Sequence, residues 1–304
     1  MSTYDSHVTT TGEWHVPAHL RSTTTQTVAP TQTVAPTRTH IYGLCGFISS
    51  GKNTAAQSLL AHTQGESHSF AGPLKDACAA IFGWPRNLLE GDTEISRQWR
   101  DTTSVHWSRV FGRHVTPRQV LQEVGTEVFR AYLPNIWCEA AVNRVRTNTT
   151  TIFTDVRFGN EMSWIDKQDG MLIWIYRPDE SRRPGVISAL IAKTIAECQP
   201  FNDPVIVALL KMAAFADGGH SSETSFLYDG DSRIHVIVQN TSTPAHLALM
   251  MQHIHLLRTT RQLGIANELP YGSVTLYLSV VDEHFLWQWG ASQQKTFPLP
   301  STHA

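Results

Sequence analysis

A short glycine-bounded loop constrains this chain more than any other feature of its sequence. The segment GFISSGKNT, Gly46 to Thr54, has the spacing G-x-x-x-x-G-K, follows the apolar run IYGLCGF and opens a helical pattern at Lys52. Glycines let such a loop curl so that backbone N–H groups point inward, and the helix N-terminus adds partial positive charge. The lysine then reaches the phosphates of a triphosphate. The sequence therefore predicts a phosphate-binding loop between a buried strand and a helix.

One position of this loop departs from the usual pattern. A Ser or Thr normally follows the lysine and binds Mg²⁺, but Asn53 stands there, and Thr54 lies roughly 100° further round the helix. Either the amide oxygen of Asn53 takes this place or the metal keeps a water there. The loop residues expected to bind the triphosphate are Gly46, Ser49, Ser50, Gly51, Lys52, Asn53 and Thr54.

Strand and helix patterns alternate along the chain after residue 40. Strands are expected near residues 69–70 and in the runs TTIFTDV, MLIWIY and RIHVIVQN, with helices between them; one helix should start at Thr116 and Pro117. Alternation of this kind predicts an α/β fold with a doubly wound parallel sheet flanked by helices.

Composition divides the chain into three parts. Residues 1–39 are rich in Thr, Ser, Pro and Gln and repeat TQTVAP, so they cannot bury enough surface to offset chain entropy and should form a disordered tail. Residues 40–261 carry the alternating pattern and should form the phosphate-binding domain. Residues 262–304, with SVTLYLSVV and HFLWQW, predict a C-terminal extension folded as a β-hairpin.

The overall charge excludes some classes of partner. Lys plus Arg number 24 against 26 Asp plus Glu, so the net charge of −2 argues against a nucleic acid polymer or an anionic membrane as partner. No apolar run approaches the ~20 residues of a membrane-spanning helix. Four separated cysteines without a CxxC pair favour a location in the cytoplasm. If the protein is viral, this is the cytoplasm of the host. The sequence leaves a homodimer open.

Several charged residues nevertheless have positions that suit phosphate chemistry. Asp155 ends the strand TIFTD, where a carboxylate can hold Mg²⁺ directly or through water; the competing interpretation is an Asp that starts the next turn. An acceptor phosphate requires at least two cations that converge on one pocket, and arginine forks suit its oxygens. The candidate cations are Lys75, Arg97, Arg100, Arg130 and Arg157.

The order of several motifs resembles the phage-type deoxynucleoside monophosphate kinase family, within the P-loop nucleoside monophosphate kinase fold. The motifs span Ile41 to about Leu257 and are GFISSGKNT, SFAGPLKDA, LEGDTEISRQ, VLQEVGTEVFR, FTDVRFGNEM, IWIYRP, HSSE and VQNTSTPAHL. The resemblance implies transfer of the γ-phosphoryl group of ATP to a deoxynucleoside 5′-monophosphate, with Mg²⁺.

Carried over by position, the resemblance also implies site residues. Lys52, Asp155 and Arg157 would be catalytic, and Asp155 and Asn53 would face the metal. Thr126 and Glu161 fall within family segments, and His220 and Glu223 match H-x-S-E without an assigned role. Arg177, Arg182 and Arg183 flank a segment longer than the family usually has, as lid cations or as a basic surface turn. The residues expected to bind the monophosphate are Lys75, Asp76, Arg97, Arg100, Glu127 and Arg130.

Two other functions remain open at this point. A kinase of the same fold could act on another small acceptor such as dephospho-coenzyme A, and an alcohol acceptor would need a carboxylate base, for which Asp76 and Asp155 are candidates. A nucleotide-binding module without turnover would fit the unusual Asn53 and the C-terminal extension. The sequence determines neither the accepted bases nor the preference for deoxyribose.

Overall fold

The computed structural model describes residues 39–178, 186–198, 203–216, 224–227, 234–241, 243–259, 276–290 and 292–300. Nearly all of the expected tail, residues 1–38, lies outside this part. Arg182, Arg183, His220 and Glu223 also lie outside the described residues.

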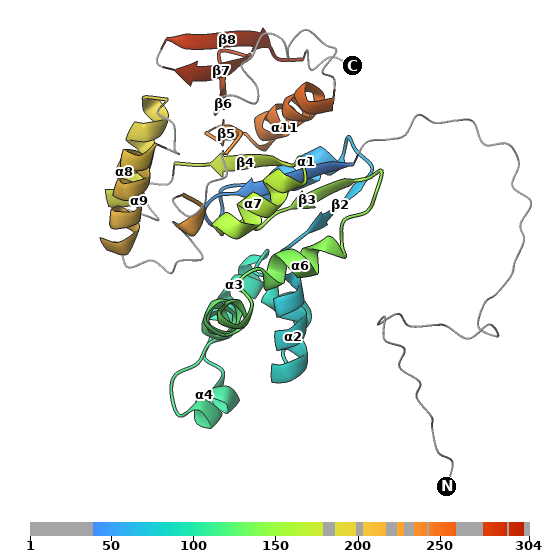
Figure 1. Ribbon diagram of the computed structural model, residues 1–304, viewed down its shortest axis with the longest axis vertical. Helices are drawn as coiled ribbons and strands as arrows, with labels where there is room; N and C mark the ends of the chain where they lie inside the picture. Colours follow the sequence, from blue (N-terminus) through green and yellow to red (C-terminus); the bar gives the residue numbers. More distant parts are fainter. Residues whose placement is uncertain are drawn as a thin grey trace, which may run out of the picture. The chain divides into compact units, whose positions relative to one another are not determined.

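A single sheet of eight strands runs through the described part of the chain (Figure 1). Its order is β2-β3-β1-β4-β5-β6-β7-β8; the strands from β2 to β6 in that order are parallel, and β7 and β8 are antiparallel. The predicted parallel α/β sheet is therefore confirmed. The strands are His40–Cys45 (β1), Gly65–His68 (β2), Thr150–Phe153 (β3), Met171–Tyr176 (β4), Val236–Gln239 (β5), Leu276–Val281 (β6), His284–Gly290 (β7) and Gln293–Pro298 (β8).

Strands β1 and β4 form the centre of the parallel part. Every residue of β4 is buried, as is every residue of β1 after His40. Parallel strands covered on both faces are continuous apolar runs, which is why both were visible in the sequence. In the register, Tyr42 lies opposite Ile152 of β3 and Met171 of β4. The loop after β1 therefore opens between the carboxyl ends of two neighbouring strands, where ligands bind in folds of this kind.

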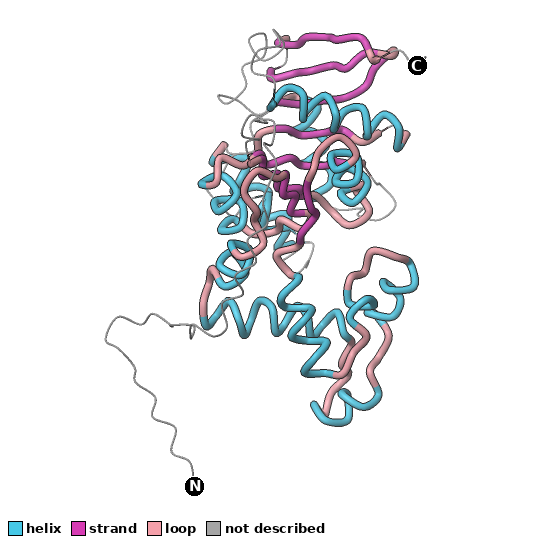
Figure 2. Tube along the Cα trace, turned by 90° about the vertical axis from the view of Figure 1, so that its right-hand side faces the viewer, coloured by secondary structure: helices cyan, strands magenta, loops and turns pink. Residues whose placement is uncertain are grey.

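Helices cover both faces of this sheet, as Figure 2 shows. Helices α1 and α11 share a core with Tyr42 and Leu44 on one face, whereas α7, α8 and α9 share a core with Phe153 and Trp174 on the other. None of the described helices is both long and apolar enough to cross a bilayer. The bounds are Lys52–Leu60 (α1), Gly159–Lys167 (α7), Val186–Ala196 (α8), Pro204–Ala216 (α9), Ser225–Leu227 (η4) and Pro244–Thr259 (α11).

A second group of helices gathers beyond the β2 edge of the sheet (Figure 1). The Trp107 Nε1 group of α4 donates a 3.0 Å hydrogen bond to the Phe82 carbonyl at the end of α2, which ties these two helices together. The predicted helix start at Thr116 is confirmed, because its hydroxyl accepts a hydrogen bond from the Gln119 N–H at 3.2 Å. The bounds are Gly72–Phe82 (α2), Arg86–Leu89 (η2), Glu94–Asp101 (α3), Val105–Phe111 (α4), Pro117–Gln122 (α5), Glu123–Arg130 (η3) and Ile136–Val142 (α6).

Two regions refine the expectations from the sequence. The strand expected near residues 69–70 is wrong by a few positions: β2 ends at His68, and the next residues form the turn into α2. The predicted C-terminal hairpin is confirmed as β6 and β7, joined at Asp282 and Glu283, and β6 also pairs in parallel with β5. The hairpin thus continues the main sheet.

Candidate active site

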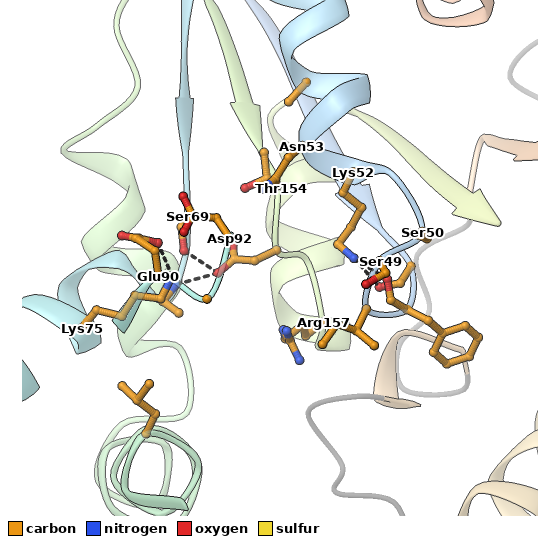
Figure 3. A pocket seen from close by; sticks show the side chains of 18 of the residues that line it. Ser49, Ser50, Lys52, Asn53, Ser69, Lys75, Glu90, Asp92, Thr154 and Arg157 are labelled. Atoms are coloured by element: carbon orange, nitrogen blue, oxygen red, sulfur yellow. Dashed lines mark hydrogen bonds and ion pairs between the residues drawn. The ribbon is translucent and has the colours of Figure 1, made fainter. Parts of the chain in front are cut away.

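A cavity of about 720 Å³ opens where the carboxyl ends of β1 and β3 meet the helices beyond the β2 edge (Figure 3). Its walls come from the loop after β1, the β2–α2 turn, α3, the α5–η3 helix and the β3–α7 turn. The predicted site residues that line it are Gly46, Ser49, Ser50, Gly51, Lys52, Asn53, Thr54, Lys75, Arg97, Arg100, Thr126, Arg130, Asp155, Arg157, Glu161 and Arg177.

The cavity is strongly cationic although the chain as a whole is not. Within the described residues, eight Lys or Arg and four Asp or Glu residues line it, an excess of four positive charges in a protein of net charge −2. Positive charge concentrated in a cleft raises the local concentration of anions. The cavity therefore favours a polyanionic ligand.

The loop between β1 and α1 curls around the ammonium group of Lys52. Its Nζ donates hydrogen bonds to the carbonyl oxygens of Gly46 at 2.9 Å and Phe47 at 2.6 Å. Ser50 is only 3% exposed, and its hydroxyl has no hydrogen-bond partner within the described structure. The loop thus presents a lysine, a buried unpaired hydroxyl and a helix N-terminus, a combination that suits phosphate oxygens.

The carboxylate of Asp155 holds the turn between β2 and α2. Its Oδ2 accepts hydrogen bonds from Ser69 Oγ at 2.5 Å and the Ala71 N–H at 3.0 Å, and its Oδ1 accepts from the Phe70 N–H at 2.8 Å. These donors immediately precede α2, so the carboxylate lies at the positive end of that helix. Asp155 therefore anchors the turn and at the same time lines the cavity.

One buried carboxylate, Glu161, organises two arginines. Its Oε2 accepts from the backbone N–H groups of Arg157 at 2.8 Å and Phe158 at 3.2 Å, and its Oε1 pairs with Arg130 Nη2 at 2.5 Å. Burial raises the pKa of Glu161, while the Arg130 guanidinium opposes that shift. Arg130 thus has its charge balanced within the protein. The side chain of Arg157 projects into the cavity between Lys52 and Lys75 (Figure 3).

Arg100 differs from these residues because it makes no hydrogen bond or ion pair in the described part of the chain. Its Nε is buried without a partner. The guanidinium packs so closely on Gly91, whose φ is 69°, that a Cβ there would lie 1.8 Å from Nη2. Burial and the charges of Arg118 and Arg157 lower the pKa of Arg100 to about 10. Asp101 and Glu90 oppose this shift only in part, and an anion in the cavity would compensate the remaining charge.

Two of the predicted monophosphate contacts have acidic partners instead. Lys75 Nζ lies 2.6 Å from Glu90 Oε2, as Figure 3 shows. Arg97 Nη2 lies 3.1 Å from Glu94 Oε2, one turn earlier on α3. Lys75 and Arg97 both line the cavity, but each already forms an ion pair with a glutamate.

Two further predicted contacts do not reach the cavity. Asp76 is exposed and pairs with Arg86 at 2.5 Å and with Arg144 at 3.5 Å. Glu127 is exposed on η3 and is not among the lining residues. Each follows a lining residue by one position, and one position turns a helical side chain by about 100°.

Arg118 and Asn240 contribute to the site without having been predicted from the sequence. Arg118 lines the cavity from the first turn of α5 and donates to Asp101 Oδ2 at 3.1 Å. Asn240 follows β5, and its Nδ2 donates to the Ser50 carbonyl at 2.8 Å. Its place at the carboxyl end of a parallel strand was the signal that could have identified it.

The fold and the site together define a class of protein. A strand, a loop that encloses a lysine and a helix, placed at the carboxyl edge of a parallel sheet, are the parts of a P-loop phosphotransferase.

Comparison with known proteins shows the family. A protein of Acanthamoeba polyphaga mimivirus, named "Putative deoxynucleotide monophosphate kinase", is 34% identical over 155 residues, a match that covers 45% of this chain and 74% of the relative. The chain belongs to the kinase family of this mimivirus protein. No model of a known protein family matches the chain.

Among solved structures, a dephospho-CoA kinase from Campylobacter jejuni is similar over 71% of this chain and 96% of that chain, with 16% sequence identity. The TM-score of this match is 0.31.

Proposed function

We propose that the protein transfers the γ-phosphoryl group of ATP to a deoxynucleoside 5′-monophosphate. The observation that carries this proposal is that one cavity holds both the lysine-containing loop and Arg100, a half-buried cation whose Nε is buried without a hydrogen-bond partner in the described structure. A triphosphate would bind in the lysine-containing loop, and a second anion, the acceptor phosphate, would bind at Arg100. The name of the mimivirus relative points to the same class of acceptor.

On the donor side, the loop after β1 would hold the triphosphate. Lys52 would exchange its bonds to the Gly46 and Phe47 carbonyls for bonds to phosphate oxygens, which carry full charge and bind an ammonium group more strongly. The unpaired hydroxyl of Ser50 would gain an acceptor at the same time.

On the acceptor side, the substrate's own chemistry limits what the protein must supply. A phosphate monoester has its second pKa near ~6, so it is largely dianionic at neutral pH and needs no general base. Arg100, with Arg118 and Arg157 close enough to lower its pKa, would hold this dianion in line with the donor. Leu74 and Trp137 line the cavity and offer the nucleoside an apolar wall.

The proposal includes Mg²⁺ bound with ATP. The described residues contain no group of three or more His, Cys, Asp and Glu that would hold a metal. At sites of this kind, however, Mg²⁺ takes ligands from phosphates and water and needs only one or two protein oxygens. Asp155 and the Asn53 amide line the cavity and fit that smaller requirement. The ion would neutralise phosphate charge, and these two residues would hold it.

The test is a product assay with the purified protein. ATP and Mg²⁺ are combined with each deoxynucleoside monophosphate, each ribonucleoside monophosphate and dephospho-coenzyme A, and the products are separated by chromatography. We expect nucleoside diphosphate and ADP in equal amounts. Phosphorylation of dephospho-coenzyme A alone would replace the proposed acceptor. Bound ATP without any product would indicate a nucleotide-binding module.

A further inference from the structure

The peptide between Ser50 and Gly51 lies at the point where the phosphate loop becomes helix α1, which begins at Lys52. The Ser50 carbonyl accepts a hydrogen bond from Asn240 Nδ2 at 2.8 Å. Ser50 is 3% exposed, so solvent has little access to replace this donor. A buried carbonyl without a donor is costly, and Asn240 therefore fixes the direction in which this carbonyl points.

Asn240 is itself held firmly from outside the loop. It is 7% exposed, it directly follows β5, and its backbone N–H donates to the Tyr176 carbonyl at the end of β4 at 2.7 Å. Two central strands of the sheet thus fix the position of its amide group. The loop is braced against the sheet by a residue 190 positions away in the sequence.

The contact also restricts Gly51. Its φ is 105°, in the left-handed region that favours glycine, and a Cβ on it would lie 2.7 Å from Asn240 Nδ2. Because a trans peptide is planar, the Gly51 N–H points away from the Ser50 carbonyl. Asn240 holds that carbonyl. None of the backbone hydrogen bonds among the described residues has the Gly51 N–H as its donor, and Gly51 lines the cavity.

We infer that Asn240 is a positioning residue for the phosphate loop: by holding the Ser50 carbonyl, it turns the Gly51 N–H toward the phosphates of the donor nucleotide. This inference rests on the proposed function, since it assigns a further residue to the donor half of the same site. Asn240 touches no reacting atom and acts through the peptide that it orients.

A positioning role for Asn240 has different consequences from a purely structural role in the fold. A structural residue would weaken both substrates together through loss of folded protein. A positioning residue for this peptide affects the triphosphate and leaves the acceptor unaffected, because Arg100 and Arg118 lie on α3 and α5.

The experiment compares Asn240→Leu, which has a similar shape without the donor, and Asn240→Asp with the matched control Asn143→Leu, at an exposed position in the α6 C-cap. Binding of inorganic tripolyphosphate and of adenosine is measured by calorimetry, and KM is measured for ATP and for the monophosphate. We expect both Asn240 variants to lose about tenfold or more in tripolyphosphate affinity and to raise KM for ATP. Adenosine binding and KM for the monophosphate should stay within twofold, and the control should match the wild type.

A second measurement covers a variant that folds poorly. In wild-type protein labelled with ¹⁵N-glycine, the Gly51 amide resonance should shift when tripolyphosphate is added, and the folded fraction of Asn240→Leu should lack that shift. Unchanged tripolyphosphate affinity with a normal Gly51 shift would overturn the inference while leaving the kinase proposal intact. Equal weakening of both substrates would also overturn it. Failure of the wild-type protein to bind ATP or tripolyphosphate would overturn both.

Discussion

Arg100 and Arg97 lie three positions apart on α3 and line the same cavity, yet they differ in electrostatic state. Arg97 pairs with Glu94, whereas Arg100 is half-buried and its Nε has no hydrogen-bond partner in the described structure. We expect Arg100→Ala to raise KM for the monophosphate about ten- to a hundredfold, because a charged hydrogen bond contributes roughly 1.5–3 kcal/mol, and Arg97→Ala to raise it much less. Titrations of each substrate at saturation of the other would measure this. A larger increase in KM for the monophosphate in Arg97→Ala than in Arg100→Ala would show that Arg97, and not Arg100, binds the acceptor phosphate.

Arg100 is also expected to affect the stability of the ligand-free protein. Its lowered pKa means that folding disfavours the charged guanidinium. We expect Arg100→Met, which keeps much of the aliphatic stem, to raise the melting temperature of the ligand-free protein. Thermal unfolding would check this, and a lower melting temperature would show that Arg100 supports the fold.

Lys52 lies at the phosphate loop after β1, on the donor side of the cavity. Replacement by Ala removes the charge that would stabilise the transferring phosphoryl group, so turnover should fall by about a hundredfold or more. The two loop carbonyls that it contacts lose their donor, so a modest loss of stability is expected as well. Initial rates of ADP formation, with circular dichroism as the check on folding, test this. Near-normal turnover would contradict the assignment of the loop.

At the scale of elements, the start of α2 depends on a carboxylate from another turn. Asp155→Asn keeps one acceptor oxygen and loses the charge near the helix N-terminus, so we expect a loss of about 1–2 kcal/mol in urea unfolding. Ser69→Ala loses only the hydroxyl bond and should cost about 1 kcal/mol. If Asp155 also faces Mg²⁺, only Asp155→Asn should raise the Mg²⁺ requirement. Equal Mg²⁺ dependence in both variants would show that Asp155 only stabilises the turn before α2 and does not bind Mg²⁺.

Helix α11 carries a buried histidine that makes stability depend on pH. His253 is 9% exposed and stacks on Phe285 at 4.5 Å, and burial lowers its pKa to about 4. Above pH ~6.5 it is neutral in both folded and unfolded chains. As the pH falls toward 4, the unfolded chain takes up the proton first, so stability falls by up to about 3 kcal/mol.

The variant His253→Phe should remove this part of the acid dependence. Urea unfolding at pH 7 and pH 4.5 would show a smaller difference in the variant than in the wild-type protein. Part of the pH dependence of stability should remain in the variant, since burial also lowers the pKa of His255 to about 4. Parallel pH profiles for the two proteins would contradict the role of His253.

At the scale of the whole molecule, the C-terminal strands complete the core around α11. Phe285 and Trp287 of β7 are 2% and 0% exposed and pack in one core with β1, β4 and α11. Trp287→Ala should therefore cost about 3–5 kcal/mol and lower the melting temperature by roughly 10 °C. Val281→Ala, at a half-exposed position in β6, is the control. A change in Trp287→Ala as small as in the control would show that this hairpin unfolds separately.

The sequence by itself determined the local parts of this protein. The phosphate loop, the central strands and the start of α5 follow from short-range rules, namely glycine spacing, continuous apolar runs and helix capping. The edge strand β2 was misplaced because GESH, which lies half exposed at the edge, lacks an apolar pattern. Alternation of strands and helices was enough for the fold class, because it leaves parallel crossovers as the regular solution.

Only the tertiary structure decided which charged residues are free and which are paired. Asp155 meets its donors across 84 to 86 residues, and Asn240 meets Ser50 across 190. Arg97 and Arg100 look equivalent in the sequence, and what separates them is desolvation and the distance to a carboxylate. Both quantities depend on which distant segments pack together, so no local pattern of residues contains them.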